Sequence, residues 1–275
     1  MTWQEHLLRR AAALIRLPSA PDRVPEVGSG GSGLECPVTG TEFLYHDGIL
    51  DLLPNDGPKT LSQRSLDTAF TAWLYDRTRE AFLRLAGLPD FETEVGNILS
   101  RLQAQPGDVV IDLACGHGNF TMEWAGLVGP DGLVIGLDIS RSMLARAAAR
   151  ITGSRATNVL LIHGDAHHLP IASASVRRVN CSGGFHAFPD LPRALREIAR
   201  ISAPGAVLTA SMFAENPRHQ HPRLRELLRV KLGLHFVPLL WLGEQLGALG
   251  YTDYVWSVPK GGFSYTSAVK GPALH

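Results

Sequence analysis

Short apolar runs alternate with longer amphipathic segments along the chain after residue 108, and glycine stands at most of the junctions. Strand-like runs cover 108–114, 133–139, 158–164, 177–183 and 206–212, and helix-like segments cover 119–128, 142–151 and 191–201. Buried β-branched runs that alternate with helices predict a parallel sheet with right-handed crossovers and helices on both faces. Residues 251–259 and 263–270 resemble two strands joined by a short glycine loop, which predicts a closing antiparallel hairpin. We therefore expect an α/β fold.

The first 106 residues follow other patterns, which predict accessory structure. Residues 1–20 predict an amphipathic helix, because charges interrupt every apolar run that a signal peptide or membrane span would need. The Gly/Ser-rich stretch 26–33 predicts a flexible linker, and short apolar pieces in 34–54 predict two or three small strands. Apolar residues at helical spacing in 61–88, and a second helix at about 91–102, predict a helical cap. We expect an N-terminal helix and ribbon-like lobe at 1–58, a helical cap or lid at 59–106 and the main domain at 107–275.

Composition and charge narrow the class of protein. The chain has 275 residues, of which 45% are apolar, so it can bury one sizeable core. Acidic and basic residues balance at 26 each, and no global field favours nucleic acid or an anionic membrane. The three cysteines, Cys36, Cys115 and Cys181, lie far apart in an uneven number, which argues for a reducing compartment. We expect a cytoplasmic enzyme that does not act on a membrane.

Candidate chemistry gathers where the first three predicted strands of the main domain end. Asp112 precedes a glycine turn that contains Gly116 and Gly118, and the next helix opens at about residue 119. Glycine lets the backbone turn sharply and lets a ligand approach closely. Asp138 ends the second strand, where a carboxylate can accept hydrogen bonds from the vicinal hydroxyls of a ribose. A third acid, Asp165, follows the third strand.

A nicotinamide dinucleotide site is the competing interpretation, because it uses the same strand, glycine turn and ribose acid. Thr121 stands where the dinucleotide fingerprint has its third glycine. Asp112 would be a poor neighbour for a pyrophosphate but a good one for a cationic sulfonium and an ammonium group. Asp165 would suit the amino group of adenine, which is a hydrogen-bond donor.

Together these segments resemble the motifs of the class I S-adenosylmethionine (SAM) dependent methyltransferases. The resemblance covers about residues 70–270 and rests on VVIDLACGHGNFT, VIGLDIS, GDAHHLP and NCSGGFHAFPDLPRALREIARISAPGAVL. It implies a Rossmann-like, mostly parallel sheet of seven strands with an antiparallel closing strand, preceded by the small N-terminal helical and β lobe. It also implies SAM as the cofactor.

Carried over position by position, the resemblance assigns roles to the acids. Asp112 and Gly116 would line the methionine part of SAM, and Asp138 would hold the ribose. Asp165 would meet the adenine amino group, and Ile139 and Ala166 would sandwich the adenine ring. The full cofactor-binding set that we expect is Asp112, Ala114, Gly116, Gly118, Asp138, Ile139, Met143, Asp165, Ala166 and Ser182.

Two residues are catalytic candidates. His186 follows the fourth strand, where acceptor and methyl group should meet, and it serves either as a general base or as a packing histidine. Tyr75, on the helix that folds over the cofactor in similar enzymes, could face the sulfonium in a cation–π contact. Phe70 and Trp73 on the same helix are explained by core packing.

The segment 34–54 resembles the small zinc ribbon that precedes some enzymes of this class, including ribosomal RNA methyltransferases. It departs from that ribbon, because Cys36 is followed by Pro37, Val38 and Thr39 and no second cysteine pair follows. Four zinc ligands cannot be assembled from it, so we expect no metal. Without the metal, and with balanced charge, an RNA substrate is disfavoured.

Our hypothesis is a SAM-dependent methyltransferase that acts on a small molecule, such as a natural product, by in-line displacement at the SAM methyl carbon. The segment from Phe213 to Trp241 would help to shape an apolar acceptor pocket. Alternatives are a cyclase or aminobutyl-type transferase that consumes SAM and releases methylthioadenosine, an RNA methyltransferase, and a non-catalytic subunit with this fold. The acceptor, the modified atom and the oligomeric state stay open.

Overall fold

The computed structural model describes residues 2–17, 19–28, 31–53, 90–215, 235–259 and 263–272. The predicted helix at 61–88 lies outside the described residues, together with Phe70, Trp73 and Tyr75. Most of the segment between Phe213 and Trp241 and the glycine loop at 260–262 also lie outside them.

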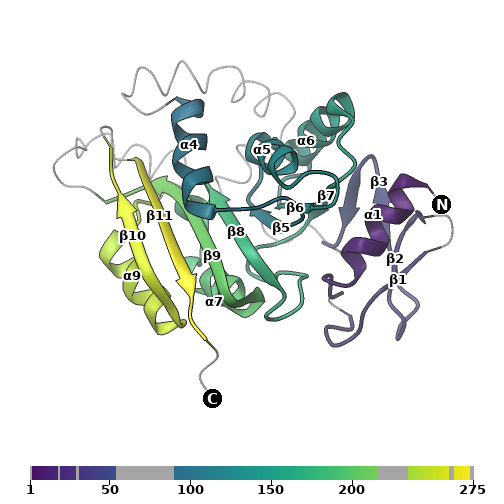
Figure 1. Ribbon diagram of the computed structural model, residues 1–275. Helices are drawn as coiled ribbons and strands as arrows, with labels where there is room; N and C mark the ends of the chain where they lie inside the picture. Colours follow the sequence, from purple (N-terminus) through teal and green to yellow (C-terminus); the bar gives the residue numbers. More distant parts are fainter. Residues whose placement is uncertain are drawn as a thin grey trace.

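The described residues form one mixed sheet with helices on both faces (Figure 1). Its strand order is β1-β2-β3-β4-β7-β6-β5-β8-β9-β11-β10. The parallel centre consists of β5 (Val109–Leu113), β6 (Leu133–Asp138), β7 (Val159–His163), β8 (Val176–Ser182) and β9 (Ser202–Phe213). The predicted terminal hairpin is confirmed as β10 (Tyr251–Ser257) and β11 (Phe263–Lys270), and β11 also pairs antiparallel with β9.

The helices predicted at 119–128, 142–151 and 191–201 are confirmed as α5 (Asn119–Val128), α6 (Arg141–Ser154) and α7 (Leu191–Ile201). The short η2 (Phe185–Ala187) and α9 (Leu239–Ala248) were not predicted. Ahead of the sheet, the helix expected at about 91–102 is confirmed as α4 (Phe91–Leu102), which begins where the Asp90 side chain accepts the amide of Thr93. Helix α6 begins in the same way, at the hydroxyl of Ser140.

The N-terminal segment is an extension of the same sheet. After α1 (Trp3–Ala12) come β1 (Glu26–Val27), β2 (Gly33–Glu35), β3 (Glu42–His46) and β4 (Ile49–Asp51). Strand β4 runs parallel to β7, with Leu50 opposite Ile162, and Figure 1 shows these elements at the sheet edge away from the β10–β11 hairpin. The seven strands expected for the main domain correspond to β5 to β11, but in the described part of the chain the sheet has eleven strands because β1 to β4 extend it. This extension was not predicted, because β4 is only three residues long and nothing in its composition indicates its partner.

The stretch 26–33 differs at both ends from the flexible linker that we predicted. Glu26 and Val27 form β1 and pair with Glu35 and Leu34 of β2, which begins at Gly33. The glycine and serine content favoured a linker, but the pairing supplies backbone hydrogen bonds that override that preference. The two or three small strands expected in 34–54 are confirmed as β2, β3 and β4.

Two apolar layers hold the sheet. One face packs against α4, α5 and α6 around Trp124 and Tyr265, which are fully buried. The other face packs against α1, α7 and α9, and buried residues of α1 such as Leu7 and Leu8 belong to the same cluster as Ile162 of β7. Burial on this scale contributes about 25 cal/mol for each Å² of apolar surface removed from water. Among the described helices, none combines the length and the apolar character that crossing a membrane requires.

Candidate functional site

The carboxyl ends of β5 and β6 meet at a loop that turns sharply from strand to helix. After β5, Gly116 has φ +55° and Gly118 has φ +79°, so both lie in the left-handed region that favours glycine. A Cβ on Gly118 would lie 3.0 Å from the Cβ of Ala147, so a glycine here permits close packing of α5 on α6. A Cβ on Gly116 would meet no atom within 4 Å, so the loop faces open space there.

Asp138, the last residue of β6, joins this loop to the next one. Its Oδ2 accepts the amide of Gly116 at 2.8 Å, and its Oδ1 accepts the amide of Ser140 at 2.8 Å. Burial raises the pKa of this carboxyl, and the backbone amides of Ser140 and Gly116 oppose the increase. A carboxylate offers about four lone-pair sites, so the bonds from the backbone amides of Ser140, Gly116 and Ile139 leave acceptor capacity that a hydroxyl group can use. The contact of Asp138 with a ribose stays a prediction.

Asp112 lies beneath the loop and is only 1% exposed. Its carboxylate accepts hydrogen bonds from Thr121 Oγ1 at 2.6 Å and from Asn180 Nδ2 at 2.8 Å. Burial raises the pKa of Asp112 to about 6, although these two bonds lower it. In this arrangement Asp112 fixes the start of α5 and the end of β8, and a direct contact with the cofactor stays a prediction.

The sequence analysis missed the polar partners of Asp112. Asn180 Oδ1 in turn accepts Thr209 Oγ1 at 3.0 Å and Ser182 Oγ at 3.1 Å, so a buried polar network runs from β5 through β8 to β9. The only signal in the sequence is an asparagine between the apolar Val179 and Cys181. Such a residue needs a hydrogen-bond partner when it is buried, and Asp112 on the neighbouring strand supplies it.

The turn after β7 carries the adenine-side residues. The β6–β7 register pairs Asp138 with His163, and the Gly164 amide donates to the Asp138 carbonyl at 3.0 Å. Ile139 and Ala166 thus follow the ends of adjacent parallel strands, as the predicted adenine sandwich requires. Asp165 is partly exposed and lies 2.6 Å from His167 Nδ1. Burial acts to raise the pKa of Asp165, but the bonds to His167 outweigh it and the net shift is downward.

The remaining expected cofactor residues lie around the same edge. Ala114 has φ +52° directly after β5, which is unusual for a residue other than glycine. Met143 is buried in the first turn of α6, and its amide donates to Ser140 Oγ at 3.4 Å. Ser182 ends β8 and is half-buried. Cys115 is buried, and burial raises the pKa of its thiol, which is consistent with an apolar loop residue.

His186 lies in η2 after β8 and is 7% exposed. Its Nδ1 accepts the backbone amide of Phe213 at 3.4 Å, and its ring meets the Phe213 ring edge-on at 4.9 Å between centroids. An Nδ1 that accepts a hydrogen bond carries no proton, so Nε2 carries it and the ring is neutral. Burial, with a smaller contribution from His235, lowers the pKa of His186 to about 4.

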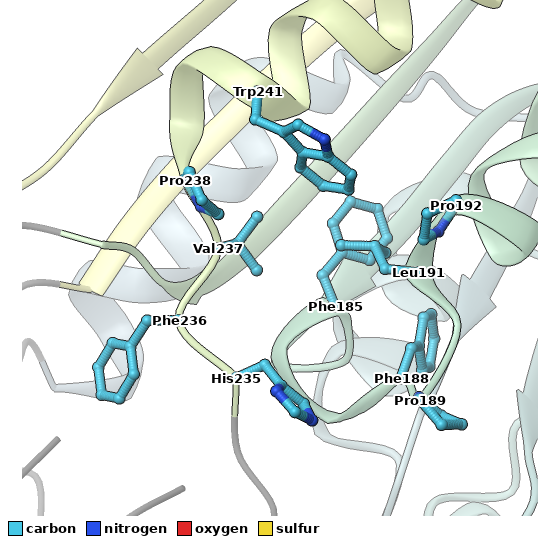
Figure 2. A pocket seen from close by; sticks show the side chains of 10 residues that line it. All are labelled: Phe185, Phe188, Pro189, Leu191, Pro192, His235, Phe236, Val237, Pro238 and Trp241. Carbon is cyan, nitrogen blue, oxygen red and sulfur yellow. The ribbon is translucent and has the colours of Figure 1, made fainter. Parts of the chain in front are cut away.

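An apolar cavity opens beside η2 at the same end of the sheet. Its volume is about 310 Å³, and it is lined by Phe185, Phe188, Pro189, Leu191, Pro192, His235, Phe236, Val237, Pro238 and Trp241. Figure 2 shows Trp241, Leu191 and Phe185 gathered at one end, with His235, Phe188 and Pro189 at the other. Phe188 also packs edge-on against His167, with ring centroids 5.9 Å apart, so the cavity adjoins the adenine-side turn.

The described residues were also compared with the ligand sets of metal sites. Within the ranges that the structure describes, no group of three or more His, Cys, Asp or Glu side chains is placed to hold a metal ion.

Part of the chain matches a known protein family. Residues 110–205 match the family described as a methyltransferase domain. This stretch runs from β5 to the start of β9 and includes all of the cofactor-binding residues expected from the sequence. This part of the chain is therefore similar to a methyltransferase domain, and such domains use SAM as their cofactor.

Curated relatives are more specific in name. The chain is 28% identical over 158 residues to the demethylmenaquinone methyltransferase of Shouchella clausii, covering 58% of this chain and 64% of that protein. It is 34% identical over 111 residues to the enzyme of the same name from Geobacillus stearothermophilus, covering 40% and 47%. The chain thus spans about half to two thirds of the length of these relatives.

Solved structures share the fold at low sequence identity. Phosphoethanolamine N-methyltransferase 2 of Haemonchus contortus, in complex with S-adenosylhomocysteine, superimposes with a TM-score of 0.65 at 15% identity. The alignment covers 77% of this chain and 59% of that one. The [4+2]-cyclase SpnF gives a TM-score of 0.57 at 17% identity, covering 74% and 96%.

Proposed function

We propose that this protein binds SAM at the carboxyl ends of β5, β6 and β7 and catalyses transfer of its methyl group to a small apolar acceptor. The observation that carries the proposal is the position of Asp138. Its carboxylate joins the Gly116 loop to the start of α6 and keeps acceptor capacity for a ribose hydroxyl. The match of residues 110–205 to a methyltransferase domain supports the same function.

Bound SAM would supply an electrophilic methyl group on a sulfonium. Asp138 holds the ribose hydroxyls, Asp165 accepts the adenine amino group, and Ile139 and Ala166 flank the adenine ring. Asp112 acts from below, where Thr121 and Asn180 fix it and its negative charge attracts the cationic methionine end. These residues align the reacting atoms, and alignment is the main source of rate in a displacement of this kind.

The acceptor occupies the cavity between η2, the start of α7 and residues 235–241. Its walls are phenylalanine, proline, leucine, valine and tryptophan side chains, which favour a flat apolar ring. The demethylmenaquinone named for the relatives is a ring of this type. The cavity adjoins the glycine loop after β5, residues 114–118. A Cβ on Gly184, which precedes Phe185, would lie 2.9 Å from the Cβ of Ala114 in this loop.

His186 does not line the cavity but lies in η2 beside it, and we propose that it acts there as a hydrogen-bond donor. Because the Phe213 amide occupies Nδ1 and the ring is neutral, Nε2–H is the group that the side chain can offer. No described residue receives a hydrogen bond from Nε2, which leaves it for an oxygen of the acceptor. With a pKa of about 4, the ring would not accept a proton at neutral pH, so it orients the acceptor and does not serve as the base.

Product analysis tests the reaction. The purified protein is incubated with SAM, with and without a panel of apolar quinones and phenols, and the small molecules are identified by mass spectrometry. We expect S-adenosylhomocysteine together with a methylated acceptor. Methylthioadenosine formed without an acceptor would contradict methyl transfer and favour the alternative SAM-consuming chemistry.

A cavity-filling variant tests the acceptor site separately. Leu191→Trp adds bulk to a side chain that lines the cavity, while Leu240→Trp adds the same bulk at a site that is 75% exposed. The KM of the acceptor should rise for Leu191→Trp only, with SAM affinity unchanged in both variants. An unchanged acceptor KM in Leu191→Trp would show that the acceptor binds elsewhere.

A further inference from the structure

A buried histidine joins the N-terminal lobe to the loop after β6, which contains Ile139 and Ser140. His163 ends β7, and its side chain is 2% exposed. Its Nδ1 lies 2.8 Å from Oδ1 of Asp51 on β4, and its Nε2 lies 3.2 Å from the carbonyl oxygen of Ile139. Ile139 stands between Asp138, the proposed ribose ligand, and Ser140, which caps α6.

The two contacts of the ring point to its charge. A backbone carbonyl can only accept a hydrogen bond, and an ionised carboxylate can only accept as well. Both ring nitrogens of His163 therefore face acceptors, and both acceptors are satisfied only when each nitrogen carries a proton. The doubly protonated ring is an imidazolium, and at 2% exposure it needs a negative partner, which Asp51 provides.

The charges around the imidazolium balance. Arg141, the first residue of α6, pairs with the other carboxylate oxygen of Asp51. The positive charge of His163 acts to lower the pKa of Asp138, against the effect of burial. Two cations, His163 and Arg141, thus face two anions, Asp51 and Asp138. This set spans the junction between β4 and the carboxyl end of β6.

Strand β4 is held to β7 at the same place. The amide of Leu52 donates to the carbonyl of His163 at 3.1 Å, and the amide of Leu53 donates to Asp51 Oδ1 at 3.3 Å. The Asp51 carboxylate therefore has a fixed position relative to His163. The stretch that matches the methyltransferase domain begins at residue 110, so Asp51 lies outside it.

We propose that Asp51 is a positioning residue for the cofactor, acting through His163 on the Ile139 carbonyl to set the loop that binds ribose and adenine. The inference rests on the proposed function, since it assigns Asp51 to the SAM site. Without the Asp51 charge, a buried imidazolium loses its counter-ion and the ring either loses a proton or shifts. When the proton leaves Nε2, or when the ring shifts, the Ile139 carbonyl loses its donor, and the ribose and adenine contacts lose their alignment.

Nuclear magnetic resonance tests the charge state in the wild-type protein. With ¹⁵N-labelled histidine, the His163 signal, assigned by its loss in His163→Gln, should show two protonated ring nitrogens at neutral pH. A His163 ring with one protonated nitrogen at neutral pH would overturn the proposal, whatever the behaviour of the variants.

Calorimetry tests the positioning role with S-adenosylhomocysteine and, separately, adenosine as ligands, at a temperature where every variant is folded. Asp51→Asn should weaken the binding of both ligands about tenfold, because the charged hydrogen bond between residue 51 and His163 is lost and the loop at Ile139 is no longer held in place. Asp47→Asn, in the same lobe with an 84% exposed side chain, is the matched control and should bind as the wild type does.

The outcomes separate the two proposals. Equal ligand affinity for Asp51→Asn and the wild type would overturn the role of Asp51 and leave the proposed function intact. A loss of thermal stability without a loss of affinity would show a structural residue only, and this also overturns the role. Failure of the wild type to bind S-adenosylhomocysteine would instead contradict the proposed function itself.

Discussion

Asp112 lies beneath the glycine loop after β5, and its two carboxylate oxygens accept hydrogen bonds from Thr121 and Asn180. Burial raises its pKa from the usual 3.8 to about 6, so the folded protein binds more protons than the unfolded chain between these pH values. Stability contributed by the protonated form is therefore present at low pH and lost as the pH rises through about 4 to 6.

Asp112→Asn should remove this pH dependence. An asparagine can accept from Asn180 and donate to Thr121, so the network stays satisfied without a buried charge. Relative to the wild type, the variant should gain about 2 to 3 kcal/mol of unfolding free energy between pH 4 and pH 7. Urea unfolding at a series of pH values measures it, and parallel curves for the two proteins would contradict the pKa shift.

Ala114 offers a second test at the scale of a residue. Its φ of +52° places an alanine in the left-handed region, which costs roughly 1 to 2 kcal/mol for a residue with a Cβ. Ala114→Gly relieves this strain, but glycine also raises the conformational entropy of the unfolded chain, which offsets part of the gain. The net effect should be a stabilisation of about 0.5 to 1 kcal/mol. Ala148→Gly, inside α6, should destabilise it by about 1 kcal/mol. Thermal unfolding distinguishes these signs, and a loss of stability in Ala114→Gly would contradict the strain.

At the scale of elements, the turn from β8 into η2 packs tightly on the glycine loop after β5. A Cβ on Gly184 would lie 2.5 Å from Cys181 Sγ and 2.9 Å from Ala114 Cβ. Gly184→Ala should therefore shift η2 and destabilise the fold by about 1 to 3 kcal/mol, as overpacking does. Gly126→Ala, in α5 with no atom within 4 Å of the added methyl, should leave stability unchanged or raise it. Chemical unfolding of both variants checks the contrast, and equal stabilities would contradict the close packing.

Element types and boundaries were largely predictable from the sequence. Helix α4 was expected at about 91–102 and the helix after the glycine turn at about residue 119, because caps, turns and apolar spacing agree there. The pairing of β4 with β7 was not predictable, since three residues carry no signal for a partner that lies more than 100 residues away. The extension of the main sheet by β1 to β4 was missed for the same reason.

The candidate site was predictable only where chemistry shows as a local motif. Asp138 and the glycine turn stand at strand ends, where a pattern of strands and turns can place them. Thr121 and Asn180, which hold Asp112, and the link from Asp51 through His163 to Ile139 depend on which strands lie side by side. That information exists only in the assembled sheet.

At the scale of the molecule, the N-terminal lobe and the main domain share one sheet and one of its two apolar layers. Leu50 of β4 and Leu7 of α1 are fully buried in the cluster that contains Ile162 of β7. We expect the lobe and the domain to unfold together. Hydrogen exchange measured by mass spectrometry should show comparable protection in peptides that cover 49–53 and 159–163. Rapid exchange of 49–53 beside a protected β7 would contradict a shared cooperative unit.

The central claim, a SAM site organised by Asp138, is tested most directly by calorimetric titration with S-adenosylhomocysteine. The wild type should bind the ligand, and Asp138→Ala should bind it about 1.5 to 3 kcal/mol more weakly, the scale of hydrogen bonds to a charged group. Asp131→Ala, an exposed acid in the turn before β6, is the control and should bind as the wild type does. Equal affinity in Asp138→Ala and the wild type, or no binding by the wild type, would contradict the account.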